Sequence, residues 1–339
     1  MAAQSSPHAG NEPNPLLIFD ALNGFARATA LKAAIELEVF TFIGAGAGTA
    51  AELAKRAQTS PKGMRILCDF MVIQGFLAKQ GEIYGLTRDS AVFLDKKSPA
   101  YMGSAAFFLV HPTHVANFMD LTAAVRKGGT VNEQGNMGPE APIWLEFAKW
   151  MAPISAMGSA ALAQIVNTPG QGMKVLDIAA GPGAYGIAIA KVNPKAEIYG
   201  LDWKNVLALS MEHAQQAGVG DRYHGIAGSA FEVDLGNGYD LVLLPNFLHH
   251  FDHATNVKLL QRVRAVMKPG GRVATVEFVP NDDRITPATA AAFSMMMLGS
   301  TESGDAYTFK ELDAMFRDAG FGESTAQELG PQTLILTKY

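Results

Sequence analysis

From about Gly172 to the C-terminus, short apolar runs alternate with segments of helical periodicity. This alternation predicts an α/β fold, a doubly wound and mostly parallel sheet with helices on both faces. Ligands of such sheets bind outside the carboxyl ends of the strands, near the point where the strand order reverses. Residues 268–271, Lys-Pro-Gly-Gly, predict a turn. The expected strands are residues 174–178, 196–202, 239–244, 272–278 and 333–338, and the expected helices are residues 184–192, 207–217, 256–267 and 309–319.

A glycine-rich loop follows the first expected strand and opens the first expected helix. Gly181, Gly183 and Gly186 match the G-x-G-x-x-G spacing of dinucleotide-binding folds. Glycines at these places allow a tight turn and a close approach of the backbone to a ligand. Asp202 ends the next strand, where its carboxylate is well placed for the two hydroxyls of a ribose. The loop therefore indicates a nucleotide-like cofactor, and two chemistries share this signal.

Two residues of the loop separate those chemistries. Asp177 stands four residues before Gly181, and a carboxylate there would repel a pyrophosphate but attract a ligand with an ammonium group. Pro182 has no N–H, so it removes one donor from any phosphate cradle. Both residues favour S-adenosylmethionine over a dinucleotide. A NAD(P)-dependent oxidoreductase stays the alternative on these residues.

Residues from about 16 to 165 have a different pattern and predict a mostly helical segment. Thr49, with Glu52 three residues later, predicts a capping box at the start of one helix. Ser60-Pro61 predicts the start of a further helix, since proline is tolerated in the first turn. Residues 77–86 then predict a short hairpin. Two helices followed by a two-stranded hairpin are typical of a winged helix.

A winged helix often binds DNA, so a ligand-responsive DNA-binding regulator is a second alternative. Between Thr49 and Lys97 there are eight Lys or Arg against five Asp or Glu, scattered along the segment. The expected recognition helix carries Lys62 and Arg65 early and is otherwise apolar. Such a helix favours a protein partner, so we expect a structural or dimerisation role and no binding of nucleic acid.

Composition excludes several classes of protein. Of the 339 residues, 48% are hydrophobic and 17% are charged, which is typical of a globular chain with a substantial core. The formal charge of −5 gives no general attraction to nucleic acid. Cys68 is the only cysteine, so an intramolecular disulfide is excluded and the cytoplasm is the expected compartment. No apolar run is long enough to span a bilayer, and residues 1–15 predict a disordered leader without the pattern of a signal peptide.

The sequence resembles class I S-adenosylmethionine-dependent methyltransferases. More narrowly, it is similar to the small-molecule O-methyltransferases, a family that includes plant caffeate and flavonoid enzymes and bacterial natural-product enzymes. The most specific stretches are residues 175–186, 200–203, 246–252 and 268–277. The resemblance implies a homodimer built through a helical dimerisation domain with a winged-helix core, residues 16–110. A helical connector, 111–165, and a Rossmann-like S-adenosylmethionine-binding domain, 166–339, would follow.

The resemblance also implies which residues hold the cofactor S-adenosylmethionine. Asp177, Gly181 and Gly183 correspond to the residues that hold the methionine part in the family. Asp202 corresponds to the acid that binds the ribose, and Trp203 to a residue that lies against the adenine.

The next cofactor contact departs from the family pattern. In the family, a Gly-Asp-x-Phe turn places its acid on the adenine amine. Here the turn reads Gly-Ser-Ala-Phe at 228–231, so Ser229 keeps a hydrogen-bonding group but the acid is lost. For Trp150 and Met151, ordinary helix packing is the alternative to cofactor contact. The further cofactor contacts that the resemblance implies are Phe231, Trp150, Met151, Ser155 and Asn246.

Methyl transfer to a hydroxyl group is helped by a general base, and histidine has a suitable unperturbed pKa. The family places a His followed by Asp-Trp after the fourth strand, and residues 247–252 here read Phe-Leu-His-His-Phe-Asp. The resemblance implies His249 as the base, with His250 in place of the neighbouring Asp and as the second candidate. Glu277 matches one of two carboxylates that orient the base. Ala306 occupies the place of the second, and the adjacent Asp305 is the candidate to compensate.

Phe293, Met296 and Met297 fall where the family lines its acceptor pocket. Met and aromatic side chains suit a flat aromatic ligand, and core packing is the alternative. His111 and His114 have a spacing that metal ligands use, but no third ligand matches, so we expect no metal site. The expected function is O-methylation of a small, aromatic or polycyclic hydroxylated acceptor. N- or C-methylation on the same fold stays open.

Overall fold

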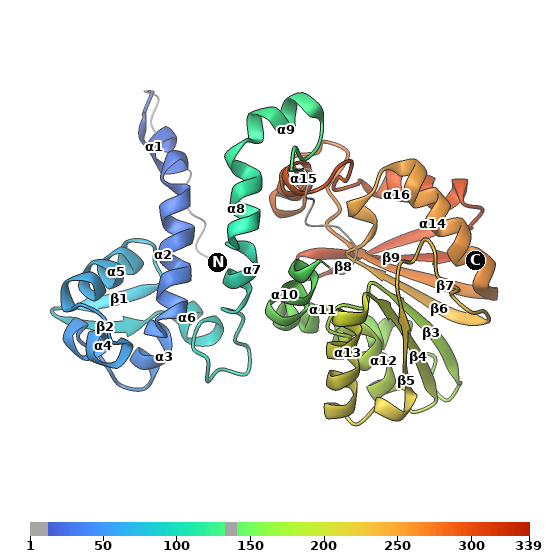
Figure 1. Ribbon diagram of the computed structural model, residues 1–339, viewed down its shortest axis with the longest axis horizontal. Coiled ribbons are helices and arrows are strands. Elements are labelled where there is room, and N and C mark those ends of the chain that lie inside the picture. Colours follow the sequence, from blue (N-terminus) through green and yellow to red (C-terminus); the bar gives the residue numbers. More distant parts are fainter. Residues whose placement is uncertain (1–12, 133–140) are drawn as a thin grey trace. The chain divides into compact units, whose positions relative to one another are not determined.

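The computed structural model describes residues 13–132 and 141–339 (Figure 1). The chain divides into two compact units, with the boundary between His111 and Pro112. Most of the predicted leader, residues 1–15, lies outside the described residues. The predicted connector, residues 111–165, falls almost wholly within the second unit.

The first unit is mostly helical. Thr49 caps α4 with the predicted capping box, because its hydroxyl accepts from the amide of Glu52 and its own amide donates to the Glu52 carboxylate. Ser60 caps α5, which begins at Pro61 as predicted. The elements of this unit are α1 (Leu16–Leu22), α2 (Gly24–Glu36), α3 (Val39–Gly44), α4 (Ala50–Ala57), α5 (Pro61–Ile73), β1 (Leu77–Gln80), β2 (Ile83–Leu86), α6 (Arg88–Phe93) and α7 (Ala105–Leu109).

The predicted hairpin is present, since β1 and β2 pair in antiparallel fashion. Buried side chains of α2 to α5 and of the hairpin, among them Phe40 and Leu53, form the core of this unit. Cys68 lies in the same core, where burial raises the pKa of its thiol to about 11. A buried thiol of this kind is inert at neutral pH. The winged-helix interpretation of α4, α5 and the hairpin stays a prediction.

The second unit contains the large sheet and the helices around it. Nowhere in the described part of the chain is a helix long and apolar enough to cross a membrane. The helices of this unit are α8 (Pro112–Met119), α9 (Leu121–Lys127), α10 (Pro142–Trp150), α11 (Ala152–Val166), α12 (Ala184–Val192), α13 (Lys204–Gln216), η1 (Gly220–Arg222), η2 (Leu248–His250), α14 (His253–Val266), α15 (Ala288–Ser300) and α16 (Phe309–Asp318). Its strands are β3 (Met173–Ile178), β4 (Ala196–Asp202), β5 (Tyr223–Ala227), β6 (Tyr239–Pro245), β7 (Met267–Glu277), β8 (Ser324–Leu329) and β9 (Gln332–Lys338).

The seven strands form one sheet in the order β5-β4-β3-β6-β7-β9-β8. The pairs from β5 to β7 are all parallel, whereas β9 is antiparallel to both β7 and β8. The strand order reverses between β3 and β6, which is where a doubly wound sheet binds its ligand. The α/β fold class and the mostly parallel sheet predicted from the sequence are confirmed.

Helices cover both faces of the sheet (Figure 1). Helices α11, α12 and α13 contribute to the apolar core on one face, and α14 and α16 to the core on the other. Successive strand residues serve opposite cores: Val175 lies in the first and Leu176 in the second, because strand side chains alternate between faces. Both faces are therefore sealed, and the strand ends are the part of the sheet that is left for a ligand.

Two strands and one α-helix of the second unit escaped prediction, each for a local reason. Strand β5 starts with Tyr-His-Gly and lacks apolar alternation, and most side chains of β8 are exposed. Helix α15 is rich in Ala and Met around its whole circumference, so it has no amphipathic period. The prediction of a turn at residues 268–271 was wrong, because β7 begins at Met267 and includes these four residues. A register shift between Tyr239 and Leu241 of β6 accommodates the irregularity.

Candidate active site

A pocket of about 330 Å³ opens at the carboxyl ends of the parallel strands, within the second unit. Its volume is in the range of small-molecule sites. The walls come from the loops after β3, β4, β5 and β6, and from α10 and α11. The predicted site residues that line it are Ser155, Gly181, Asp202, Trp203, Ser229, Phe231, Asn246 and His250. The other aromatic lining residues are Trp144, Phe147, Tyr185, Phe247 and Phe251.

The loop after β3 turns tightly through three left-handed residues, Ala179 with φ 55° and two glycines. Gly181 has φ 55° and Gly183 has φ 79°. A Cβ on Gly183 would lie 3.2 Å from the hydroxyl oxygen of Tyr223, so the position also lacks the space for a side chain. His213 of α13 holds the loop from outside, with its Nδ1 2.9 Å from the carbonyl oxygen of Pro182.

Asp177, near the end of β3, is fully buried. Its Oδ2 accepts a hydrogen bond from the Gly186 amide at 3.0 Å, whereas its Oδ1 has no hydrogen-bond partner among the described residues. Burial raises the pKa of this carboxyl to about 8, and the nearby Asp202 contributes to the rise. A buried carboxylate with an unsatisfied oxygen fits the ammonium group of an amino-acid ligand such as S-adenosylmethionine.

Asp202 ends β4 and is fixed by the backbone on both sides. Its Oδ2 accepts from the Gly181 amide at 2.8 Å, and its Oδ1 accepts from the Trp203 amide at 2.7 Å. Burial raises the pKa of its carboxyl to about 6. Each carboxylate oxygen keeps a further lone pair, which suits the predicted contact with ribose hydroxyls.

The turn at 228–231 follows β5 and lines the same pocket. Ser229, which stands where the family has an acid, accepts a hydrogen bond from the Phe231 amide at 3.2 Å. Arg262 of α14 holds the turn from behind: its Nε donates to the carbonyl oxygen of Ala230 at 3.2 Å, and its Nη2 to that of Val233 at 2.7 Å. The adenine contact expected here therefore rests on a hydroxyl and on backbone groups.

The three predicted cofactor contacts between residues 150 and 155 do not all reach the pocket. Ser155 of α11 lines the pocket, but Trp150 and Met151 are not among its described lining residues. Trp150 ends α10, and its Nε1 donates to the carboxylate of Glu146 one turn earlier.

Trp144 and Phe147 are the residues of α10 that line the pocket. The sequence does contain a signal for this pair, because residues at i and i+3 share one face of a helix. The ring of Trp144 lies edge-on to that of His250, with 5.8 Å between the centroids.

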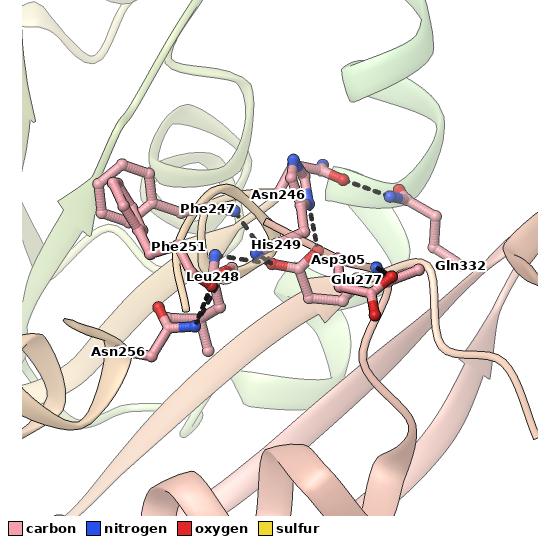
Figure 2. Close-up of polar contacts among 10 residues, drawn as sticks. Asn246, Phe247, Leu248, His249, Phe251, Asn256, Glu277, Asp305 and Gln332 are labelled. Carbon is pink, nitrogen blue, oxygen red and sulfur yellow. Dashed lines mark hydrogen bonds and ion pairs between the residues drawn. The ribbon is translucent and has the colours of Figure 1, made fainter. Parts of the chain in front are cut away.

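His249 lies in the short helical turn η2, directly after β6, and is 5% exposed. Its Nδ1 is 2.5 Å from Oε2 of Glu277, which ends β7 (Figure 2). The other carboxylate oxygen accepts from the backbone of the same turn, including the Leu248 amide at 2.9 Å. The structure thus brings the predicted base and its predicted orienting carboxylate into contact.

His250 also belongs to η2 but has a different environment. It lines the pocket, and its Nδ1 has no hydrogen-bond partner within the described part of the chain. Burial, with a contribution from His249, lowers the pKa of its imidazole well below the usual range. His250 is therefore neutral at physiological pH.

The second orienting carboxylate of the family has no equivalent contact here. Ala306 is fully buried, and the Oδ1 of Asp305 accepts from the Ala306 amide at 2.8 Å. The Oδ2 of Asp305 pairs with Arg284 at 3.4 Å. Among the described residues, Asp305 makes no hydrogen bond with His249, so the contacts leave Glu277 as the carboxylate that orients it.

The predicted acceptor residues all lie on α15. The ring of Phe293 stands edge-on to that of His249, with 4.9 Å between centroids, and is therefore next to the proposed base. Met297 is buried, and Met296 accepts a weak hydrogen bond from Ser300 at 3.9 Å on the same helix. Across the described residues, no group of three His, Cys, Asp or Glu side chains could hold a metal ion.

Sequence comparison decides between the chemistries that this geometry allows. The O-methyltransferase domain matches residues 139–322, and the O-methyltransferase dimerisation domain matches residues 19–96. The chain belongs to the O-methyltransferase family. This family uses S-adenosylmethionine as methyl donor, the ligand that the carboxylate of Asp177 fits, and the chain is an S-adenosylmethionine-dependent methyltransferase. The predictions of the family and of the cofactor are confirmed.

Relatives of this O-methyltransferase span nearly its whole length. It is 30% identical over 313 residues to the 3-hydroxy-5-methyl-1-naphthoate 3-O-methyltransferase of Streptomyces sahachiroi, covering 91% of this chain and 90% of that protein. It is 26% identical over 327 residues to the tetracenomycin polyketide synthesis 8-O-methyl transferase of Streptomyces glaucescens, covering 92% and 93%. The crystal structure of a candidate O-methyltransferase from Nostoc punctiforme superposes with a TM-score of 0.93 at 51% identity, covering 97% of this chain and 100% of that one.

Proposed function

We propose that this O-methyltransferase methylates a hydroxyl group of a small polycyclic aromatic acceptor, with His249 as the general base. The observation that carries the proposal is the contact between His249 Nδ1 and Glu277 Oε2 beside the pocket. S-adenosylmethionine, when bound, supplies an electrophilic methyl group on a sulfonium. The chain's own task is then to bind the donor, orient the acceptor and remove the hydroxyl proton.

The pairing with Glu277 fixes how His249 would move that proton. Because Nδ1 donates its hydrogen to the carboxylate, Nε2 is left as the acceptor of a proton. The acceptor hydroxyl gives its proton to Nε2 while its oxygen forms the new bond to the methyl carbon. The carbon–sulfur bond breaks, and its electron pair stays on the sulfur. Glu277 then stabilises the imidazolium through the same contact.

The cofactor assignments follow from two buried acids, of which Asp202 lines the pocket and Asp177 lies buried behind the glycine loop. We assign the donor's ammonium group to Asp177, whose Oδ1 has no partner among the described residues, and its ribose to Asp202. Gly181 and Gly183 allow the backbone to approach the methionine part, and Trp203 offers a ring for the adenine.

An aromatic acceptor is supported by the side chains around His249 and by the two curated relatives. Phe293 and Phe278 pack with 4.3 Å between their ring centroids, and Phe293 also faces His249. The relatives act, by their names, on a hydroxynaphthoate and in tetracenomycin synthesis. A flat polycyclic phenol has the shape and the polarity that such surroundings accept.

We further propose a cytoplasmic homodimer formed through residues 16–110. The helices α1 and α2 expose large apolar side chains in the single chain, which indicates a surface for a second copy. A single buried cysteine suits a reducing compartment. The exposed residues are Leu16, Leu17, Ile18, Phe19, Leu22 and Phe25.

The test is an assay of the purified enzyme with S-adenosylmethionine and a panel of hydroxynaphthoates and larger polycyclic phenols. Mass spectrometry and NMR of the product identify the atom that carries the new methyl group. A methyl ether supports the proposal. A methyl group on carbon or nitrogen, or tighter binding of NADH than of S-adenosylhomocysteine, would refute it.

A further inference from the structure

The turn that carries His249 begins with an unusual backbone conformation. Asn246, directly after β6, has φ 53°. Asn tolerates this left-handed region better than most residues because its short amide side chain can form local hydrogen bonds. The Asn246 amide still donates to the carbonyl oxygen of Val276 in β7 at 2.8 Å. The chain therefore changes direction at Asn246 while it remains attached to the sheet.

This change of direction aims the next three amides at one oxygen atom. The N–H groups of Phe247, Leu248 and His249 donate to Oε1 of Glu277 at 3.1, 2.9 and 3.4 Å (Figure 2). Consecutive amides that converge in this way form an anion-binding concavity. The conformation of Asn246 thus decides where the Glu277 carboxylate lies, and with it the imidazole that contacts Oε2.

The side chain of Asn246 is held from another part of the sheet. Gln332 is the first residue of β9, and its Nε2 donates to Oδ1 of Asn246 at 2.5 Å (Figure 2). Strand β9 is the neighbour of β7 and not of β6, so this bridge crosses the end of β7, where Glu277 pairs with Thr333. The bridge connects the outer hairpin of β8 and β9 with a residue that lines the cofactor pocket.

The far end of the turn has separate supports. The Nδ2 of Asn256 donates to the carbonyl oxygen of Leu248 at 2.9 Å, and the hydroxyl of Tyr307 donates to that of Phe251 at 2.5 Å. Neither contact reaches Asn246. Among the described residues, the beginning of the turn is therefore held by two side chains, Glu277 at the Phe247 amide and Gln332 at the Asn246 side chain.

We propose that Gln332 is a positioning residue for methyl transfer, acting through Asn246 on the turn that holds Glu277 and His249. The proposal rests on the role of His249 as the base. It predicts an effect on the chemical step from a side chain that belongs to a hairpin on the far side of β7.

The first experiment compares Gln332→Leu with a matched exchange, Gln327→Leu, at an exposed position of β8. Gln332→Leu is expected to lower kcat about ten-fold, because small displacements of a base cost turnover steeply. The KM for S-adenosylmethionine should stay within about three-fold, since the loss belongs to the transition state. Gln327→Leu should leave both constants unchanged. Equal kcat values in the two variants, or a lowered melting temperature of Gln332→Leu with wild-type kcat, would overturn the proposal.

A double-mutant cycle tests whether Gln332 acts through Asn246. Asn246→Gly keeps the left-handed backbone without strain and removes the acceptor of the bridge. If the bridge is the route, Gln332→Leu lowers kcat in the wild-type background but has no further effect in Asn246→Gly. Independent, multiplicative losses would contradict the proposed route.

A third readout separates this proposal from the base assignment. With S-adenosylhomocysteine bound, the Nδ1 proton of His249 should give a downfield NMR signal because of its short contact with Glu277, and His249→Ala identifies that signal by its loss. Gln332→Leu should move the signal upfield, and Gln327→Leu should not. An unmoved signal overturns the role of Gln332. Full turnover in His249→Ala would instead refute the role of His249 as the base. The comparison of the signal between the wild type and Gln332→Leu would still test the bridge.

Discussion

Asp177 is fully buried. Burial raises the pKa of its carboxyl, whereas the ammonium group of a bound donor would lower it. Without a ligand, burial favours the protonated form, as the pKa of about 8 expresses. An ammonium group next to Oδ1 reverses that preference. Under the proposed assignment, the same side chain destabilises the protein without donor at alkaline pH and binds the ammonium group of the donor.

The exchange Asp177→Asn tests this anchor with little change of shape. The amide can still accept from Gly186, but it carries no charge to meet an ammonium group. S-adenosylhomocysteine should bind about 30-fold more weakly or worse at pH 8, because a buried charge pair has lost one partner. Isothermal titration calorimetry measures the Kd. Wild-type affinity in this variant would reject the proposed orientation of the donor.

His249→Ala addresses the base. Turnover should fall by a factor of about 10² to 10⁴, because the hydroxyl proton loses its acceptor, whereas the Kd of S-adenosylhomocysteine should change little. His253→Ala is a matched control, since His253 is exposed on α14 and pairs with Asp318. A drop of equal size in both variants would remove His249 from the chemical step.

At the scale of single residues, Asp177 and Asp202 were picked out by their type and their place near the ends of strands, whereas His249 and Glu277 were implied by the family resemblance. All four lie near the carboxyl ends of strands, which the parallel sheet brings together. Gln332 could not be predicted, because its contact with Asn246 joins residues 86 positions apart through a conformation that no spacing reveals.

Two helices of the second unit support the pocket by reaching backbone carbonyls of its loops. From α13, His213 contacts Pro182 in the glycine loop, and from α14, Arg262 contacts Ala230 and Val233 in the turn after β5. The guanidinium of Arg262 is a charged donor, and charged donors make some of the stronger hydrogen bonds in proteins. The loops are thereby fixed by two side chains that do not line the pocket themselves.

Arg262→Leu should loosen the turn at 228–231 and so weaken donor binding. We expect the KM for S-adenosylmethionine to rise more than kcat falls, with a loss of about 1–3 kcal/mol in the free energy of unfolding. Lys258→Leu, an exposed exchange on the same helix, is the control. Steady-state kinetics and urea unfolding measure the two effects; unchanged KM and stability would show that the turn holds itself.

Elements were predicted where their pattern was strong. The bounds of α12 and β4 agree with the expected ranges, because Gly183 precedes α12, and Asn193-Pro194 separates it from the apolar run of β4. Strand β8 was missed because it is an exposed edge strand, held by pairing to β9 rather than by an apolar face. Helix α15 was missed because burial around it on several sides removes the polar stripe by which a helix is recognised.

For the whole molecule, the buried acids predict a pH dependence of stability. Asp177 has its pKa raised from the usual 3.8 to about 8, so the folded protein binds a proton that the unfolded chain has released. Its contribution to stability is present below pH 4 and is lost as the pH rises to about 8. His250, whose pKa is lowered, acts in the opposite direction below its usual value of 6.5. The net fall in stability with rising pH should therefore be clearest between pH 6.5 and 8.

Thermal melts of the empty enzyme across that interval check the expectation. The melting temperature should fall from pH 6.5 to 8, and the rise produced by saturating S-adenosylhomocysteine should grow over the same range. In Asp177→Asn both slopes should flatten. A flat profile in the wild type would mean that another group compensates the charge of Asp177.

The proposed homodimer gives a prediction for the first unit. Phe25 is 74% exposed in the single chain, and a charge there should prevent a second copy from covering α1 and α2. Phe25→Glu should convert a dimer into a monomer in light scattering, whereas Ile285→Glu, at a 71% exposed site of the second unit, should not. A dimer in both variants would place the interface elsewhere.

The unsatisfied oxygen of Asp177 has a consequence for the lifetime of the enzyme in a cell. A chain without donor opens more often than a loaded one, and opened chains are the ones that proteases cut. Starvation for methionine would then shrink the enzyme population as well as its supply of methyl groups. A pulse-chase of the protein in starved and fed cells would show this as a shorter half-life, and Asp177→Asn should abolish the difference.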